Sequence, residues 1–263
     1  MPSFSRVLLG LFCLLVAVLL LAPTLVVIPM SFNGNKSLAF PPVGFSWQWY
    51  ENFFRNPDWT TSFSNSLVIA LIVAVVATVI GTLAAFGITR TAARTGGILR
   101  ALLITPMVVP GVVLAIGIYA VYLDTHLVGT VTGFVLAHTM LAIPFVLIAV
   151  QASLEVFDRR LETAASSLGA GRLTVFRTVT LPLILPGILS GALFAFITSF
   201  DEIIVALFIT SPYLKTLPVQ IYTSITRDAD PTVAAVGTLL FFATSLIIIA
   251  GLLFGMHRGR TRP

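Results

Sequence analysis

Long stretches without a charged residue are the feature that most constrains the fold of this chain. A transmembrane helix needs about 20 consecutive apolar residues. Five charge-free intervals reach that length, and a sixth is interrupted only by Asp201 and Glu202. In a bilayer, helices satisfy their own backbone hydrogen bonds. The sequence therefore predicts an all-α integral membrane protein with six transmembrane helices in one domain, 1–263, with spans at about 7–29, 62–88, 101–123, 130–152, 183–210 and 232–256.

The composition agrees with a membrane protein. Of the 263 residues, 57% are hydrophobic and 10% are charged, and the mean hydropathy is +1.04. The net charge of +5 comes from arginines at the ends of apolar runs, which indicates topology rather than nucleic-acid binding. The single cysteine, Cys13, excludes an intramolecular disulfide and is expected to be a small buried apolar residue. The first apolar run exceeds the ~7–15 residues of a signal sequence, so we treat it as a span.

The distribution of basic residues predicts the orientation, because cytoplasmic loops are enriched in Lys and Arg. Four lie in one set of alternate segments: Lys36, Arg55, Lys215 and Arg227. Eleven lie in the other set: Arg6, Arg90, Arg94, Arg100, Arg159, Arg160, Arg172, Arg177, Arg258, Arg260 and Arg262. Both termini and segment 155–182 are therefore expected in the cytoplasm.

An aromatic segment lies outside, between the first two spans. Residues 45–59 contain all three tryptophans, Trp47, Trp49 and Trp59. Since tryptophan prefers the membrane interface, we expect a helix lying flat on the outer leaflet, with a docking surface for an external partner as the alternative. Prolines inside the spans, at positions 106, 110, 144 and 186, predict kinked or broken helices around a pathway, or simple packing kinks.

The cytoplasmic segment 155–182 is polar and rich in small side chains. A helical patch is followed by the turn Gly169-Ala170-Gly171, and the chain resumes up to Leu181-Pro182. We expect two short helices around a glycine hinge, forming a knob on the membrane surface where a soluble partner docks.

No catalytic or metal-binding pattern is present in the sequence. His126, His138 and His257 have no acidic or histidine neighbour at helical spacing, and His138 is read as a packed residue of the fourth span. No phosphate-binding loop occurs. We therefore expect no enzyme activity, metal or cofactor on this chain.

Asp201 and Glu202 are the strongest polar signal within a span. An acid at the centre of a transmembrane helix costs ~2.5–3.5 kcal/mol, so such residues usually face a pathway or a partner. One of the two could line a pathway for a cationic cargo while the other pairs with a neighbour. The alternative is that both only cap the outer end of the helix. Phe196, Phe200 and Phe208 could add cation–π contacts or could face lipid.

The cytoplasmic segment also resembles the EAA loop of permease subunits of bacterial ABC importers. That loop has Glu-Ala-Ala, then Gly, then Ile-x-Leu-Pro at fixed spacing. The positions that align with it are Thr163, Ala164, Ala165, Gly169, Val179, Leu181 and Pro182. Thr163 stands where glutamate is usual, and Glu162 precedes it. The stretches PMVVPGVVLAIG (106–117) and SFDEIIVALFIT (199–210) are similar to the second permease subunit of spermidine/putrescine importers.

The resemblance implies the type I ABC importer (MetI-like) fold in a bacterial inner membrane. The expected partners are a homologous permease, two copies of an ATPase that holds ATP and magnesium, and an external solute-binding protein. The expected cargo is a polyamine or a related amine-bearing solute. Coupling to the ATPase would fall to Glu162 and the aligned EAA positions, and Asp201 and Glu202 would contact the cargo.

Other functions remain open from sequence alone. Related permeases carry amino acids, GABA, opines or phosphonates. A secondary carrier or channel subunit without an ATPase would leave the cytoplasmic knob unexplained, and a scaffold protein would leave the acidic pair without a role.

Overall fold

The structure, a computed structural model, describes residues 4–260, and within that range all regular secondary structure is helical. Five helices are long and apolar enough to cross a membrane, and one bent helix pair makes a sixth span if it is counted as one. The predicted all-α membrane class is confirmed. The chain forms two compact units, Thr61–Gln220 and the pair of terminal parts ending at Thr60 and beginning at Ile221, and each is described by itself. Arg262, counted above for orientation, lies outside the described residues.

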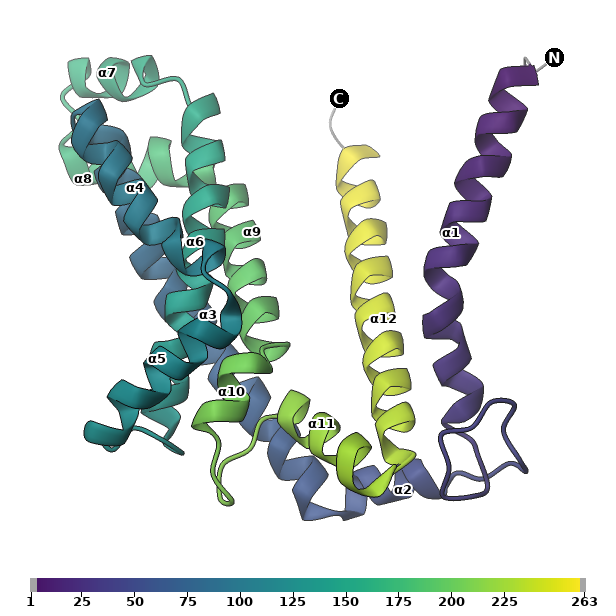
Figure 1. Cartoon of the computed structure of the whole chain (residues 1–263). Coiled ribbons are helices and arrows are strands. Elements are labelled where there is room, and N and C mark those ends of the chain that lie inside the picture. The colour runs from purple at the N-terminus through teal and green to yellow at the C-terminus, as the bar shows by residue number, and fades with distance from the viewer. Residues whose placement is uncertain (1–3, 261–263) are drawn as a thin grey trace. The chain divides into compact units, whose positions relative to one another are not determined.

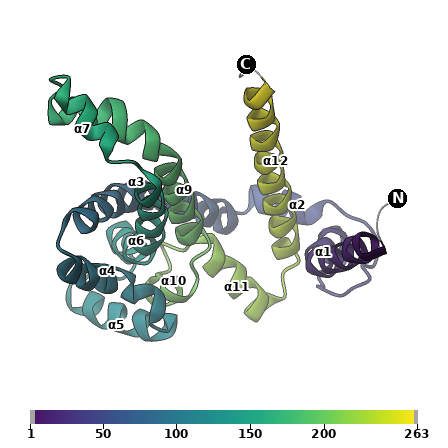
Figure 2. The same ribbon diagram turned by 90° about the horizontal axis from the view of Figure 1, so that it is seen from above.

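The Thr61–Gln220 unit is a bundle of long helices with a short helix beyond one end. Figure 1 shows α6 and α9 side by side with α3, and α7 lying past the upper ends of these helices. In the view from above, α7 extends sideways from the bundle (Figure 2). The helices are α3 (Pro57–Arg90), α4 (Ala93–Val108), α5 (Gly111–Asp124), α6 (Val131–Val156), α7 (Arg160–Ser167), α8 (Arg172–Val175), the π-helical turn η1 (Phe176–Thr180), α9 (Leu181–Phe200), α10 (Ile204–Ile209) and the start of α11 (Leu217–Asp228).

Small residues let α3, α6 and α9 approach closely. Val146 of α6 is fully buried. A Cβ atom added to Gly191 of α9 would lie 3.1 Å from the Val146 Cα, and one added to Gly81 of α3 would lie 2.7 Å from the Val146 Cβ. In membranes, helices associate through this kind of close packing because the lipid gives no hydrophobic driving force between them.

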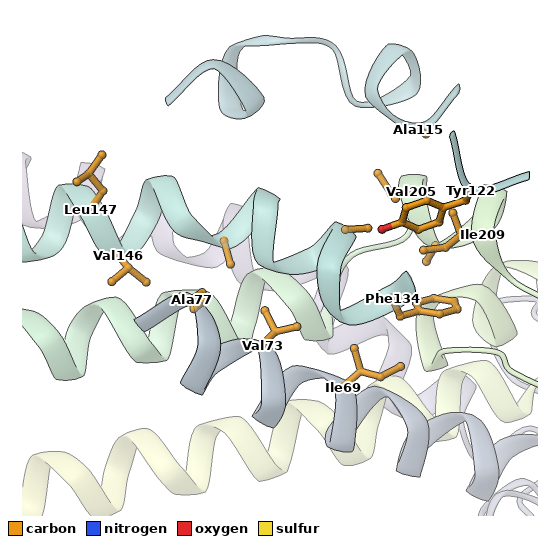
Figure 3. Close-up of a cluster of buried hydrophobic side chains, with 14 of the residues drawn as sticks. Ile69, Val73, Ala77, Ala115, Tyr122, Phe134, Val146, Leu147, Val205 and Ile209 are labelled. Atoms are coloured by element: carbon orange, nitrogen blue, oxygen red, sulfur yellow. The ribbon is translucent and has the colours of Figure 1, made fainter. Parts of the chain in front are cut away.

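The core of this unit continues from these helices to α5 and α10. Figure 3 shows the buried side chains of α3, α6, α5 and α10 meeting in one cluster. Phe134 is fully buried there, and the hydroxyl of Tyr122 donates to the carbonyl of Gly133 at 3.0 Å. The core therefore holds α10, the short helix after the acidic pair, against α5 and α6.

The other unit consists of α1 (Phe4–Met30), α2 (Gln48–Arg55), the end of α11 and α12 (Thr232–Arg260). α1 contacts α12 near its own C-terminal end, where Val27 lies beside Gly237, and Asn52 of α2 donates a side-chain hydrogen bond to the Thr232 hydroxyl at 2.8 Å. Cys13 is exposed on α1, so its expected burial is wrong. The long apolar face of α1 leaves that side chain uncovered.

The aromatic segment 45–59 is only partly as expected. Its helix α2 is short, and Trp47 beside it is 58% exposed. Trp59 is 1% exposed, because α3 begins at Pro57 and carries Trp59 inward in its first turn. Trp49 donates from its ring nitrogen to the Asn33 carbonyl at 2.6 Å. Trp59 is therefore covered by protein, and the interfacial position of the three tryptophans stays a prediction.

The third predicted span, 101–123, is two helices. α4 and α5 meet at an angle of 99°. Pro110 lies at the break, where it lacks an N–H donor and keeps Val109 in an extended conformation (ψ 134°). Pro144 and Pro186 lie inside uninterrupted helices. Of the prolines predicted to break or kink spans, Pro110 marks the sharp bend.

Candidate functional site

Segment 155–182 folds as one short helix joined to a long one. α7 is the first of the two predicted helices. The second differs from the prediction, because α8, η1 and α9 follow without a break and form a single helical stretch, Arg172–Phe200. Pro182 cannot donate a backbone hydrogen bond. The widened turn η1 precedes it, with the Leu181 N–H bonded to the Phe176 carbonyl.

Gly169 forms the turn that ends α7, as the sequence predicts. Its φ is +83°, a left-handed conformation that favours glycine. The Gly169 N–H bonds the Ser166 carbonyl at 3.0 Å, and the Ala170 N–H bonds the Ala165 carbonyl at 3.2 Å. These two bonds form a Schellman motif, which satisfies carbonyls at the helix end. The turn therefore directs the chain from α7 back towards α8.

Most EAA-loop positions on α7 face solvent. Thr163 and Ala164 are exposed, and Ala165 is half-buried. Of the aligned positions further along, Val179 and Leu181 are half-buried and Pro182 is exposed. Large apolar side chains flank this surface, since Val156 is 88% and Leu168 90% exposed. Sequence reasoning did not single out these two, although a large apolar residue in a polar segment is the signal that could have found them.

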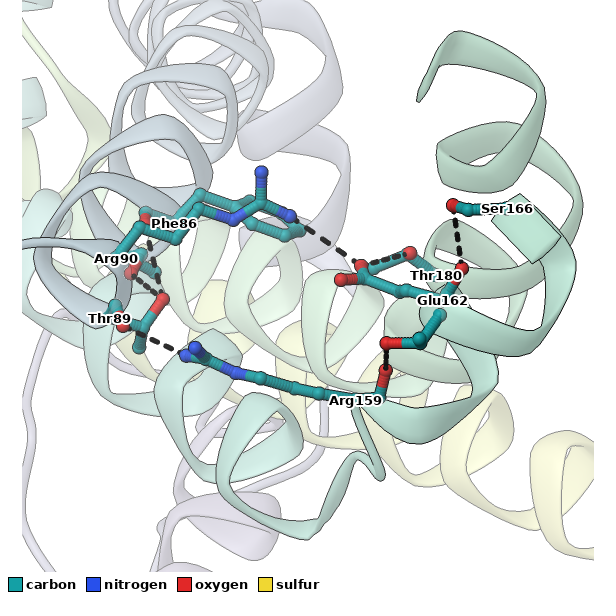
Figure 4. Close-up of polar contacts among 9 residues, drawn as sticks. Phe86, Thr89, Arg90, Arg159, Glu162, Ser166 and Thr180 are labelled. Carbon is teal, nitrogen blue, oxygen red and sulfur yellow. Dashed lines mark hydrogen bonds and ion pairs between the residues drawn. The ribbon is translucent and has the colours of Figure 1, made fainter. Parts of the chain in front are cut away.

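Glu162 turns the other way, towards the body of the unit. Its Oε1 accepts a hydrogen bond from the Thr180 hydroxyl at 2.6 Å and lies 3.5 Å from a guanidinium nitrogen of Arg90. The Arg159 guanidinium donates to the Thr89 carbonyl at 2.8 Å. Figure 4 shows these contacts between α7, the end of α3 and η1. Arg90 and Thr180 were not among the predicted site residues, because nothing in the sequence pairs them with Glu162.

The two acidic residues lie at the opposite end of α9 from this cluster. α9 has 20 residues, or about 30 Å at 1.5 Å per residue, which is close to the thickness of a hydrocarbon core. The helix stops at Phe200, and α10 starts at Ile204. The predicted continuous span 183–210 is therefore interrupted where the acids lie.

The interruption separates the roles of Asp201 and Glu202. The Glu202 carboxylate accepts the backbone N–H groups of Val205 at 2.9 Å and Ala206 at 2.8 Å. It therefore caps the free amides of α10, and its side chain is only 11% exposed. Asp201 ends α9 and is exposed. The sequence left open which acid pairs with a neighbour, and in the structure it is Glu202.

His138 completes this buried polar cluster. Its Nε2 lies 3.7 Å from Glu202 Oε2, and its Nδ1 is 2.9 Å from the Ser199 hydroxyl. The imidazole is fully buried in α6. Sequence reasoning treated His138 as a lone packed residue because it looked for partners along one helix. Pairing the ionisable residues of two neighbouring spans could have found the cluster.

Aromatic rings pack together near the C-terminal end of α9, which Asp201 follows. Phe196 and Phe200 are stacked with centroids 5.7 Å apart, and Phe63 of α3 meets Phe200 edge-on at 6.3 Å. Phe208 instead contacts Tyr119 of α5. Of the three phenylalanines named from sequence, two therefore form a group in the last turns of α9, before Asp201. Among the described residues, no group of three or more His, Cys, Asp or Glu side chains could hold a metal ion.

Comparison with known proteins identifies the family. Residues 77–258 match the family described as "Binding-protein-dependent transport system inner membrane component". The chain belongs to this family. This permease is 31% identical over 242 residues to the spermidine/putrescine transport system permease protein PotC of Haemophilus influenzae, with 90% of this chain and 92% of the relative covered.

Relatives in Escherichia coli (strain K12) are similarly close. The spermidine/putrescine transport system permease protein PotC is 31% identical over 257 residues, with 97% of this permease and 96% of the relative covered. The putrescine transport system permease protein PotI is 32% identical over 235 residues, with 87% and 83% covered. These are transport subunits. The permease is accordingly a multi-pass inner-membrane subunit of an ABC importer and not an enzyme.

Solved structures confirm the ABC permease fold. A chain of a bacterial ABC transporter involved in the import of the acidic polysaccharide alginate has a TM-score of 0.70 and 16% identity, covering 97% of this permease and 98% of that chain. A chain of an amino acid ABC transporter has a TM-score of 0.59 and 15% identity, with 80% and 98% covered. Since the first of these transporters imports an acidic cargo, the fold alone does not select the charge of the solute.

Proposed function

We propose that this permease moves polyamines such as putrescine and spermidine into the cytoplasm. The observation that carries the proposal is the exposed carboxylate of Asp201 at the break between α9 and α10. An acid attracts a cationic amine, and the rings of Phe196 and Phe200 in the last turns of α9 would add cation–π attraction to an amine that reaches them. The spermidine/putrescine permeases named above support the same class of cargo.

Glu202 has a different role in this proposal. Its carboxylate already accepts two amide hydrogen bonds from α10 and lies against His138. We assign it to holding the break in the span, which keeps Asp201 exposed. Of the acidic pair, Asp201 is the residue that meets the cargo.

ATP hydrolysis on a separate protein would drive the movement. As an importer permease, this chain works with another permease, an ATPase and a binding protein, and we propose that two ATPase copies hold the ATP and magnesium. The exposed face of α7, with Thr163 and Ala164, would dock on one of them together with Leu168, which follows the helix. Closure of the ATPases would then shift the spans between two global states. The excess of basic residues in segments 90–100 and 159–177 supports a cytoplasmic position for α7 and for both termini.

Replacing Leu168 by aspartate is expected to weaken ATPase binding. Leu168 is 90% exposed, so the change costs the fold of the free chain little, while it would bury a charge in the docked interface. We expect the amount of ATPase that co-purifies with the permease complex to fall about tenfold or more, as for an interface hot spot.

Tyr213→Asp is the matched control for this experiment. Tyr213 is 93% exposed in the loop after α10, far along the chain from α7, and the substitution introduces the same charge. The amount of ATPase that co-purifies with the Tyr213→Asp variant should equal the amount that co-purifies with the unsubstituted complex. Equal loss of the ATPase in both variants, or in neither, would contradict docking through α7.

A further inference from the structure

Apolar packing contributes little to the orientation of α7. None of the eight residues of α7 is buried, and Leu161 and Leu168 are exposed. A helix of this length is unstable on its own in water. Polar contacts to the rest of the unit therefore contribute much of what holds α7 in place.

Glu162 makes the shortest of these contacts. It accepts the hydroxyl hydrogen bond of Thr180 at 2.6 Å, and Thr180 is fully buried in η1, directly before α9. A hydrogen bond to a charged acceptor is stronger than one between neutral groups. A buried hydroxyl without a partner is also unfavourable. The bond therefore favours the position of α7 that keeps Glu162 over the start of α9.

Two arginine contacts hold α7 in this position relative to α3, one made by Arg90 and one by Arg159. Arg90 lies 3.5 Å from the Glu162 carboxylate, and its guanidinium is 5.4 Å from the ring centroid of Phe86. Phe86 in turn meets Phe176 of η1 edge-on at 5.6 Å. Arg159 donates to the Thr89 carbonyl at the C-terminal end of α3, where a positive charge is favourable. Figure 4 shows Glu162 between Arg90 and Thr180.

We infer that Glu162 is a positioning residue: its contacts to Thr180 and Arg90 hold α7 against the ends of α9 and α3, so that a displacement of α7 moves both spans. We call this set of contacts the lock. The inference rests on the proposed docking of α7 to an ATPase. It divides α7 into two faces. Thr163 and Ala164 face outward for the partner, and Glu162, one residue earlier, faces inward and is occupied within the chain. Thr163, at the usual glutamate position, then lies on the docking face, and Glu162 makes contacts only within the chain.

The lock is tested by removing the Thr180 hydroxyl with Thr180→Val, which keeps the shape of the buried side chain. In the complete transporter reconstituted in vesicles, we expect the ATPase to co-purify at the normal ratio. We expect transported solute per ATP hydrolysed to fall about fivefold, the lower end of typical coupling between linked sites. Thr178→Val is the matched control, because the Thr178 hydroxyl is exposed and donates only to the Thr174 carbonyl of its own helix.

Two further measurements separate the lock from general damage. In the Cys13→Ser background, a nitroxide on Ser167→Cys should be more mobile by EPR in the Thr180→Val variant than with Thr180 or with Thr178→Val. The double variant Glu162→Gln, Thr180→Val should lose no more coupling than the worse single variant, because residues of one unit are not additive. Unchanged nitroxide mobility, or additive losses, would overturn the inference.

The outcomes also distinguish the lock from the proposed function. If no ATPase accompanies the unsubstituted chain, the proposed function is wrong. If the ATPase accompanies every variant and the solute per ATP is unchanged, the lock is wrong and the proposed function stands. If Glu162→Gln releases the ATPase, Glu162 belongs to the docking face and the lock is overturned.

Discussion

Replacing Asp201 by asparagine is expected to reduce polyamine uptake about tenfold or more, the effect of removing one partner of a close charge pair. Asparagine keeps the size of the side chain and removes its charge. Asp201 only ends α9 with its backbone, through the bond from its N–H to the Ile197 carbonyl at 3.0 Å. Expression and assembly of the complex should therefore stay normal. The measurement is uptake of radiolabelled putrescine and spermidine by the complete transporter.

Two variants sharpen the interpretation of this result. Asp124→Asn removes another exposed acid, at the end of α5, and should leave uptake unchanged. Glu202→Gln keeps an acceptor oxygen for α10 but loses one of two amide bonds, so it should lower the stability of the permease more than Asp201→Asn does. If Asp201→Asn transports polyamines as well as the unsubstituted complex, the acid is not on the cargo pathway.

Substituting leucine for Gly191 is expected to prevent correct packing of α6 and α9. The first side-chain atom would already lie 3.1 Å from the Val146 Cα, and Val146 is fully buried among α3, α6 and α9. Backbone atoms cannot move aside as the end of a flexible side chain can. We expect a loss of about 3 kcal/mol or more from overpacking. Thermal unfolding of the detergent-solubilised complex, with size-exclusion chromatography, measures the effect.

Gly97→Leu is the control for leucine at a helical glycine. Gly97 is exposed in α4, and no atom lies within 4 Å of an added Cβ. This variant should unfold at the same temperature as the unsubstituted complex or higher, because leucine favours the helix more than glycine does. Equal stability of the Gly191 and Gly97 variants would show that α6 and α9 do not pack as described.

The features that follow from local sequence were predictable. Hydropathy located the membrane helices because each span carries its own signal over about 20 residues. The end of α7 at Gly169 was also predictable, since a glycine after a helical patch marks the left-handed position of a helix end. Local sequence could not show which of the prolines in the spans lies at a sharp bend. Only the structure shows that Pro110 lies at the bend and that Pro144 and Pro186 lie in continuous helices.

The contacts that define the site depend on residues distant in the sequence. Glu162 and Arg90 are 72 residues apart, and His138 and Ser199 are 61 apart. Spacing within one helix reveals neither pair. The burial of Trp59 was not predictable for a related reason, because residue type predicts a preference for the interface, while the direction of α3 after Pro57 decides that the ring is buried.

Uptake into vesicles that enclose ATP tests the central claim most directly. The permease would be reconstituted with its partner permease and the ATPase, and the binding protein and radiolabelled putrescine would be added outside. We predict uptake that requires enclosed ATP, stops with a non-hydrolysable ATP analogue and is inhibited by unlabelled spermidine. Uptake that proceeds without ATP and follows an ion gradient, or ATP-driven uptake that excludes polyamines, would contradict the account.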